Sequence, residues 1–182
     1  MFKLIRAYQK LDPSASNGLE ILFLYPGIKA IICHRLAHRL FLWKIPFLPR
    51  IIAEISRWLT GIEIHPGASI GHECVFDHGM GIVIGETAII GDRVLIYQGV
   101  TLGSRKITRL GGKRHPTIED DVVLGAGCKI IGNITIEKNA RVGANSVVLK
   151  NVPAGATVVG IPARTISKES SEYKEWELEF YI

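Results

Sequence analysis

The chain has 182 residues, of which 47% are hydrophobic and 21% are charged, and it carries a formal net charge of +5. This length is typical of one domain, and this composition is typical of soluble globular proteins. The lysines and arginines are scattered, without the clustered basic stripe and interleaved aromatic residues of nucleic-acid-binding surfaces. The composition therefore argues against a nucleic-acid partner, and the positive charge suits a phosphorylated small ligand equally well.

Nothing in the first part of the chain indicates a membrane span or a secretory signal. The apolar runs at 21–25 and 45–48 are far shorter than the roughly 20 residues that a membrane-spanning helix needs. The start of the chain also lacks the basic, apolar and small-residue order of a signal peptide. We therefore expect a cytoplasmic protein without membrane association.

Residues 1–60 are expected to form a helical N-terminal region. Pro49 suits the first turn of a helix over 49–59, because the missing N–H has no intrahelical partner there. The segment 27–43 favours an amphipathic helix, because its apolar residues recur every four positions. These residues are Ile28, Ile32, Leu36 and Leu40.

Residues 61–166 are organised by aliphatic residues that recur every six positions. A period of six fits neither an α-helix nor a hairpin strand, but it suits a chain that turns every six residues along a triangular coil. Because such coils bury their apolar side chains only against one another, the pattern predicts a parallel β-helix domain. The anchor residues form three blocks: Ile64, Ile70 and Phe76; Ile84, Ile90, Ile96 and Leu102; and Ile118, Leu124, Ile130, Ile136, Val142 and Val148.

The repeat is interrupted twice, and each interruption pushes chain out of the coil. The first contains His78, and the second is the basic, glycine-containing loop 103–117, which contains His115. Two protruding segments that each carry a histidine suggest a shared cleft. From spacing alone, a turn histidine bound to backbone stays open for His78, and a solvated basic loop stays open for His115.

The two interruptions and the repeats around them resemble the serine acetyltransferases, a family of hexapeptide-repeat acyltransferases. The resemblance covers 61–166 almost continuously. It implies a left-handed parallel β-helix, a handedness that the spacing itself does not determine. The motifs that carry it are IHPG at 64–67, DHGMGIVIGE at 77–86, RHP at 114–116 and VVGIPAR at 158–164.

The resemblance implies transfer of an acetyl group from acetyl-CoA to L-serine, which forms O-acetylserine in cysteine biosynthesis. It assigns the general base to His78, because the serine hydroxyl must lose its proton as it attacks the thioester. The family orients this base with an aspartate, and Glu63 stands at that position here. Transfer to a sugar or another hydroxyl acceptor on the same scaffold is the enzymatic alternative.

The resemblance also implies which residues hold the two substrates. Arg114 suits the serine carboxylate, because a guanidinium group binds a carboxylate through two hydrogen bonds. The other residues implied for serine are Asp12, Glu86 and His115. The residues implied for the pantetheine arm of acetyl-CoA are Gly103, Ala126, Gly127 and Ala144, with Arg141 at a nucleotide phosphate.

Members of the family form trimers with sites between neighbouring β-helices, so the resemblance implies a homotrimer. They also insert a C-terminal isoleucine into O-acetylserine sulfhydrylase. The acidic tail 167–182 ends at Ile182, so a regulatory sulfhydrylase partner and a plain acidic tail both stay open. No metal is expected, because the histidines lie within acetyltransferase motifs and lack the ligand spacing of β-helical zinc enzymes.

Overall fold

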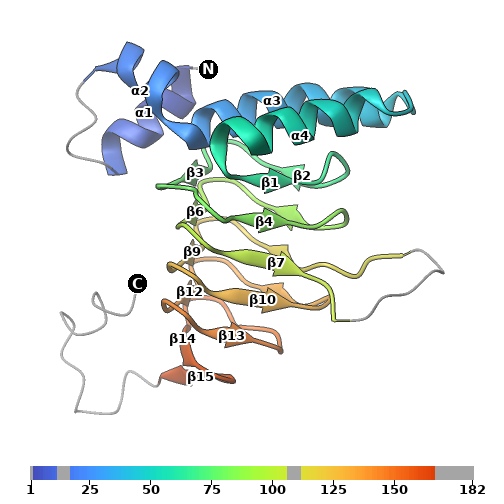
Figure 1. The fold of residues 1–182 in the computed structure, drawn as a ribbon. Helices are drawn as coiled ribbons and strands as arrows, with labels where there is room; N and C mark the ends of the chain where they lie inside the picture. The colour runs from blue at the N-terminus through green and yellow to red at the C-terminus, as the bar shows by residue number, and fades with distance from the viewer. Residues whose placement is uncertain (1, 12–16, 106–111, 167–182) are drawn as a thin grey trace.

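The computed structural model describes residues 2–11, 17–105 and 112–166, which form helices followed by a coil of short strands (Figure 1). The helices lie across one end of the coil. None of the described helices is long and apolar enough to cross a membrane. They are α1 (Phe2–Leu11), α2 (Gly18–Leu24), α3 (Pro26–Leu42) and α4 (Leu48–Thr60).

The helices expected over 27–43 and 49–59 are confirmed as α3 and α4. The apolar stripe expected on α3 is wrong, because Leu36 is 54% exposed and the buried face includes Ile31 and His34 instead. Pro26 and Pro49 lie in the first turns of these helices, where their missing N–H groups interrupt no helical hydrogen bond. Helix α4 ends at Gly61, whose φ of 71° is the left-handed conformation that glycine adopts without strain. This turn leads the chain directly into the first strand of the coil.

The predicted parallel coil is confirmed, with three sheets that form the faces of a prism. Sheet A has the order β1-β4-β7-β10-β13, sheet B β11-β8-β5-β2, and sheet C β15-β14-β12-β9-β6-β3. The hairpin of β14 (Thr157–Gly160) and antiparallel β15 (Ala163–Ile166) ends the coil. The other strands are β1 (Glu63–Ile64), β2 (Ser69–Ile70), β3 (Val75–Phe76), β4 (Val83–Ile84), β5 (Ile89–Ile90), β6 (Leu95–Ile96), β7 (Thr101–Gly103), β8 (Thr117–Ile118), β9 (Val123–Leu124), β10 (Lys129–Ile131), β11 (Thr135–Ile136), β12 (Arg141–Val142) and β13 (Val147–Val148).

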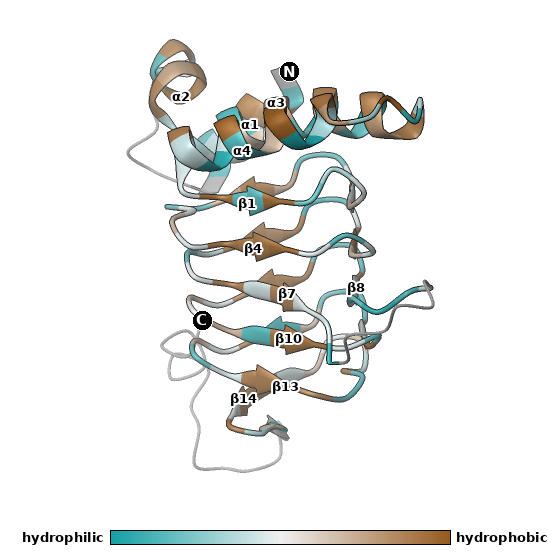
Figure 2. Ribbon diagram, turned by 45° about the vertical axis from the view of Figure 1, so that its right-hand side comes forward, coloured by the Kyte–Doolittle hydropathy of each residue, from teal (hydrophilic) through white to brown (hydrophobic). Residues whose placement is uncertain are grey.

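All the predicted anchors lie at the second residue of a strand and line the inside of the coil, where hydrophobic residues follow the strands (Figure 2). In sheet A, Ile84 pairs with Leu102, and Leu102 pairs with Ile130. The register places each anchor directly on the next. The two interruptions of the repeat therefore bulge at the edges without shifting the stacked core.

Phe76 closes the core at the helical end and is 1% exposed. The hydroxyl of Tyr8 in α1 donates to the Phe76 carbonyl at 3.3 Å and accepts from the Phe76 N–H at 3.1 Å. Tyr8 thus takes the place of a further strand above β3. This contact joins the N-terminal helices to the coil.

The edges of the prism are named by the sheets that they join. The A–B edge contains 65–68, 85–88, 104–105, 112–116 and 132–134. The C–A edge contains 77–82, 97–100, 125–128 and 143–146. Both edges border sheet A, and the predicted catalytic and serine-binding residues that the structure describes lie on or beside them.

Buried His34 in α3 is expected to make stability fall in mild acid. Burial, together with the nearby charge of His38, lowers the pKa of His34 to about 4. Unfolded histidine titrates near 6.5, so the unfolded chain binds more protons between these values. The free energy of unfolding should therefore fall as pH drops from about 6.5 towards 4, by up to about 1.4 kcal/mol per pH unit. Urea unfolding of the wild type and His34→Gln across this window checks it: an equally steep fall in the variant contradicts the assignment.

Candidate active site

The A–B edge brings together three of the residues expected to bind serine. Glu86 follows β4, while Arg114 and His115 precede β8, so the returning end of the second interruption lies beside the corner between β4 and β5. Arg114 Nη2 donates to Glu86 Oε2 at 2.6 Å, and both side chains are about one-third exposed (32% and 36%). A cation and an anion are thus held side by side at a surface that a small ligand can reach.

His115 is held deeper in the same edge and is 7% exposed. Its Nδ1 lies 3.0 Å from Thr87 Oγ1 and 3.1 Å from Thr87 N. Burial lowers the pKa of His115, and the charge of Arg114 lowers it further against the opposing effect of Glu86. The imidazole is therefore held in its neutral form near neutral pH.

Gly85 leaves the space that the His115 ring occupies, because a Cβ at residue 85 would overlap the imidazole ring. We expect Gly85→Ala to displace His115, to destabilise the fold by about 1–3 kcal/mol through overpacking and to raise the KM for L-serine. Urea unfolding and steady-state kinetics measure the two effects. Gly18→Ala is the matched control, since its Cβ would only touch Ile5 at 3.5 Å. Wild-type behaviour of Gly85→Ala would show that the ring does not need this space.

His78 lies on the C–A edge, in the turn between β3 and β4. Its φ of 55° is left-handed, and its side chain is exposed. The Asp77 N–H donates to the Ile96 carbonyl at 2.9 Å, which fastens the turn to the coil below. The turn therefore presents the His78 imidazole to solvent from a fixed backbone.

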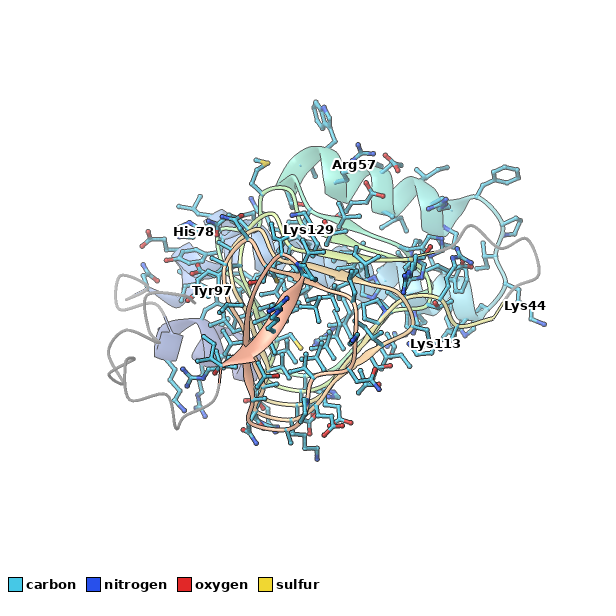
Figure 3. All side chains as sticks on the ribbon, turned by 90° about the horizontal axis from the view of Figure 1, so that it is seen from below. Lys44, Arg57, His78, Tyr97, Lys113 and Lys129 are labelled. Atoms are coloured by element: carbon cyan, nitrogen blue, oxygen red, sulfur yellow. The ribbon has the colours of Figure 1, made fainter. Side chains whose placement is uncertain are left out.

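Tyr97 lies one coil below His78, on the same side of the molecule (Figure 3). Burial raises the pKa of the Tyr97 phenol, and the negative charge of Asp77 raises it further. The Tyr97 phenol is therefore uncharged at neutral pH, and Tyr97 shares the C–A edge with His78. Tyr97 is not among the residues expected at the site, although it directly follows the anchor Ile96, which stacks on Phe76.

Glu63, the expected partner of His78, begins β1 beside the same C–A edge. Its Oε2 lies 3.5 Å from Arg57 Nε in α4, and the two side chains are 47% and 53% exposed. Among the described residues, no hydrogen bond joins Glu63 to His78. Its orienting role stays a prediction, and Arg57 is a competitor that the sequence did not indicate.

Small residues continue the C–A edge below His78. Ala126 and Gly127 lie at this edge two coils below the His78 turn, and Ala144 lies in the next coil. The Asn145 N–H donates to the Ala126 carbonyl at 2.7 Å, which stacks these corners. Gly103 ends β7 in sheet A and lies beside the A–B edge instead. The residues expected along the pantetheine arm are thus divided between two edges.

A basic groove runs along the A–B edge towards the end of the coil. A pocket of about 310 Å³ contains Arg105, Lys113 and Arg114, and burial lowers the pKa of Lys113. An adjoining pocket of about 630 Å³ contains Arg105, Lys150 and Arg164. Such a groove suits phosphate groups, which bind to arginine and lysine. The sequence indicates Arg114 and the basic loop that contains Arg105 and Lys113, but not that Lys150 and Arg164 lie beside them, because these two residues are distant in the chain.

Arg141, expected at a nucleotide phosphate, lies elsewhere. It begins β12 in sheet C, is exposed, and lines neither of the two basic pockets. Asp12 and Ile182 lie outside the described residues. Within the described ranges, no group of three or more His, Cys, Asp or Glu side chains could hold a metal ion.

The two histidine-bearing edges do not meet within one chain. His78 lies between sheets C and A, whereas His115 lies between sheets A and B. Figure 3 shows His78 and Lys113 on opposite sides of the coil. The shared cleft suggested by the sequence is therefore not formed by a single copy.

Comparison with known proteins gives one consistent result. Residues 115–150 match the family model "Bacterial transferase hexapeptide (six repeats)". The chain is 55% identical to a serine acetyltransferase of Synechococcus elongatus over 91% of this chain and 69% of that protein. It is 51% identical to a serine acetyltransferase of Helicobacter pylori over 92% of this chain and 96% of that protein.

Solved structures agree with these relatives. The soybean serine acetyltransferase apoenzyme has a TM-score of 0.86 and 42% identity, over 90% of this chain and 66% of that chain. A serine acetyltransferase complex with CoA has a TM-score of 0.83 and 41% identity, over 90% and 67%. This chain thus spans about two thirds of those structures and nearly all of the Helicobacter pylori protein. The expected left-handed parallel β-helix is confirmed by these neighbours.

Proposed function

The chain belongs to the serine acetyltransferases, and from that premise we propose that it transfers the acetyl group of acetyl-CoA to L-serine, giving O-acetylserine and CoA. One observation supports this acceptor over a sugar: the adjacent carboxylate of Glu86 and guanidinium of Arg114 at the A–B edge. An amino acid carries an ammonium and a carboxylate group, which this pair complements. A sugar offers no charge to either.

In the proposed reaction, His78 accepts the proton of the serine hydroxyl as the oxygen attacks the thioester carbonyl. The tetrahedral intermediate then collapses, the carbon–sulfur bond breaks, and the protonated His78 returns its proton to the departing CoA sulfur. Glu63 is proposed to orient the imidazole and to stabilise its charged form. Arg114 and His115 hold the serine, and the small residues of the C–A edge admit the pantetheine arm.

The site is proposed to form between copies of the chain in a homotrimer. The C–A edge of one copy supplies His78, and the A–B edge of the next supplies Arg114 and His115. The two edges flank sheet A. If three copies form a ring with sheet A facing the three-fold axis, the C–A edge of each copy meets the A–B edge of the next, which gives three equivalent sites. The basic groove would then lie next to the pantetheine path, where the phosphates of CoA require cations.

Mixing two inactive variants tests this shared site. We expect His78→Ala and Arg114→Ala to be nearly inactive alone, because each damages every site. Every mixed trimer contains one site to which both contributing copies bring the needed residue, so isolated mixed trimers should recover about a third of the wild-type rate. The measurement is acetyl transfer by mixed trimers isolated through two different affinity tags. No recovery in confirmed mixed trimers would place both residues in one copy's site.

The activity itself is tested by CoA release from acetyl-CoA with L-serine, compared with a panel of sugars and other hydroxyl compounds. L-Serine should give the highest kcat/KM. Its amide, which lacks the carboxylate that Arg114 is proposed to bind, should react much more slowly. A sugar preferred over L-serine would contradict the proposed acceptor.

Two further proposals concern a partner and a location. The first is binding of O-acetylserine sulfhydrylase through the C-terminal Ile182, and the second is a location in the cytoplasm. Deleting Ile182 and measuring sulfhydrylase affinity by titration calorimetry tests the first. Equal affinity of both forms would remove that partner proposal.

A further inference from the structure

Thr87 at the A–B edge is bound to each of the three residues that precede Pro116. Its Oγ1 accepts from the Arg114 N–H at 2.9 Å and from the His115 N–H at 3.1 Å. Its carbonyl accepts from Lys113 Nζ at 3.1 Å. Thr87 follows Glu86 directly, so one short segment holds both the acidic partner of Arg114 and the backbone on which Arg114 and His115 are carried.

The hydrogen-bond capacity of Thr87 determines how it meets the His115 ring. A hydroxyl group has one proton and two lone pairs. The N–H groups of Arg114 and His115 occupy the lone pairs, so the hydroxyl proton is left for His115 Nδ1, which lies 3.0 Å from Oγ1. The Thr87 N–H points to the same ring nitrogen at 3.1 Å.

Two donors directed at Nδ1 leave this nitrogen only one role, that of acceptor. A neutral imidazole has one protonated and one unprotonated nitrogen, so the proton of neutral His115 resides on Nε2. The Nε2 side of the ring faces Gly85, next to the Glu86–Arg114 pair. An N–H donor on Nε2 would therefore lie next to the Glu86–Arg114 pair, where the amino acid is proposed to bind.

We propose that Thr87 is a positioning residue that sets the tautomer of His115, so that His115 donates a hydrogen bond from Nε2 to an oxygen of the bound acceptor substrate. The inference rests on the proposed function, because it takes Arg114 and His115 as the serine-binding pair. It gives the two histidines different tasks: His78 removes a proton, and His115 supplies a donor. With Nδ1 already occupied and Nε2 protonated, His115 cannot compete for the serine proton.

Kinetics of three variants test the positioning role. Thr87→Val keeps the side-chain shape but leaves the Arg114 and His115 N–H groups without their acceptor, so KM for L-serine should rise about tenfold or more. The KM for acetyl-CoA should change less than about twofold, because only the acceptor side is disturbed. Thr87→Ser keeps the hydroxyl and should stay within about threefold of the wild type. The matched control Thr135→Val makes the same change on sheet B, where the described structure gives the hydroxyl no hydrogen bond.

Nitrogen-15 NMR of the His115 ring, assigned by comparison with His115→Asn, tests the tautomer without substrate. In the wild type, neutral His115 should show protonated Nε2 and unprotonated Nδ1. The pKa of His115 should rise in Thr87→Val, since a hydrogen bond that stabilises the neutral form is lost, and should stay at its wild-type value in Thr87→Ser.

The outcomes separate this inference from the proposed function. A wild-type ring protonated at Nδ1, or a Thr87→Val enzyme with unchanged serine KM, would overturn the inference while serine acetylation stands. Absence of serine acetylation in the wild type, with the predicted tautomer present, would overturn the proposed function instead. If Thr87→Val does not fold, the wild-type spectrum and the Thr87→Ser kinetics still decide.

Discussion

His78→Ala should lower kcat for acetyl transfer to L-serine by about 10²–10⁴-fold, the usual contribution of a positioned general base. The imidazole projects from a fixed turn and is exposed, so its removal should leave the fold intact. Steady-state rates with saturating substrates measure kcat. Titration calorimetry with CoA, whose affinity should be nearly unchanged, shows that the loss lies in the chemical step.

His72→Ala is the matched control for this experiment. His72 also lies in a turn after a strand of the coil and its side chain is 80% exposed, but it lies at the junction of sheets B and C, away from both edges of the proposed site. It should keep the wild-type rate. A His78→Ala enzyme within about tenfold of the wild type would contradict the assignment of the base, since a tenfold change corresponds to only about 1.4 kcal/mol.

Phe76→Ala should lower the free energy of unfolding by about 3–5 kcal/mol, the usual cost of removing a large buried aromatic side chain. Phe76 fills the end of the coil, and its backbone holds the Tyr8 hydroxyl. The cavity would therefore open between the coil and α1. Urea unfolding followed by circular dichroism measures the change.

Two controls separate the effect of packing from that of the Tyr8 hydrogen bonds. Phe76→Leu keeps most of the apolar volume and should recover most of the stability. Tyr8→Phe keeps the ring and removes the hydroxyl, so it reports the loss of the two contacts to the Phe76 backbone. If the free energy of unfolding of Phe76→Ala is less than about 1 kcal/mol below that of the wild type, the core collapses around the missing ring and the prediction is wrong.

The sequence predicts the coil well because its period is a direct consequence of the structure. An inward residue is needed once per face, so the anchors from Ile64 to Val148 identify the strands without knowledge of any distant contact. The closing hairpin of β14 and β15 is different. It pairs antiparallel and departs from the hexad, so the repeat carries no sign of it.

The candidate site is less predictable, because it depends on side-chain contacts between segments that lie far apart in the chain. The sequence correctly associates Arg114 and His115 with Glu86, through motifs of a known family. The repeat also implies that His78 lies across sheet A from them, because with three anchors per turn the first interruption follows the third anchor and the second follows the seventh. The sequence does not predict the contact between Glu63 and Arg57, because this contact depends on the direction in which α4 approaches the coil.

The pairing of strands across the second interruption allows the loop at this corner to vary in evolution without disturbing the coil. Strand β7 pairs in register with β10 although the loop 104–116 departs between them, and the Gly132 N–H still donates to the Gly103 carbonyl at 2.9 Å. Because the ladder continues without regard to what leaves the corner, lengthening the loop costs little more than its closure entropy. Loops at such corners can therefore be replaced or lengthened while the strands of the coil stay paired, so that new acceptor specificities can arise on the same β-helix.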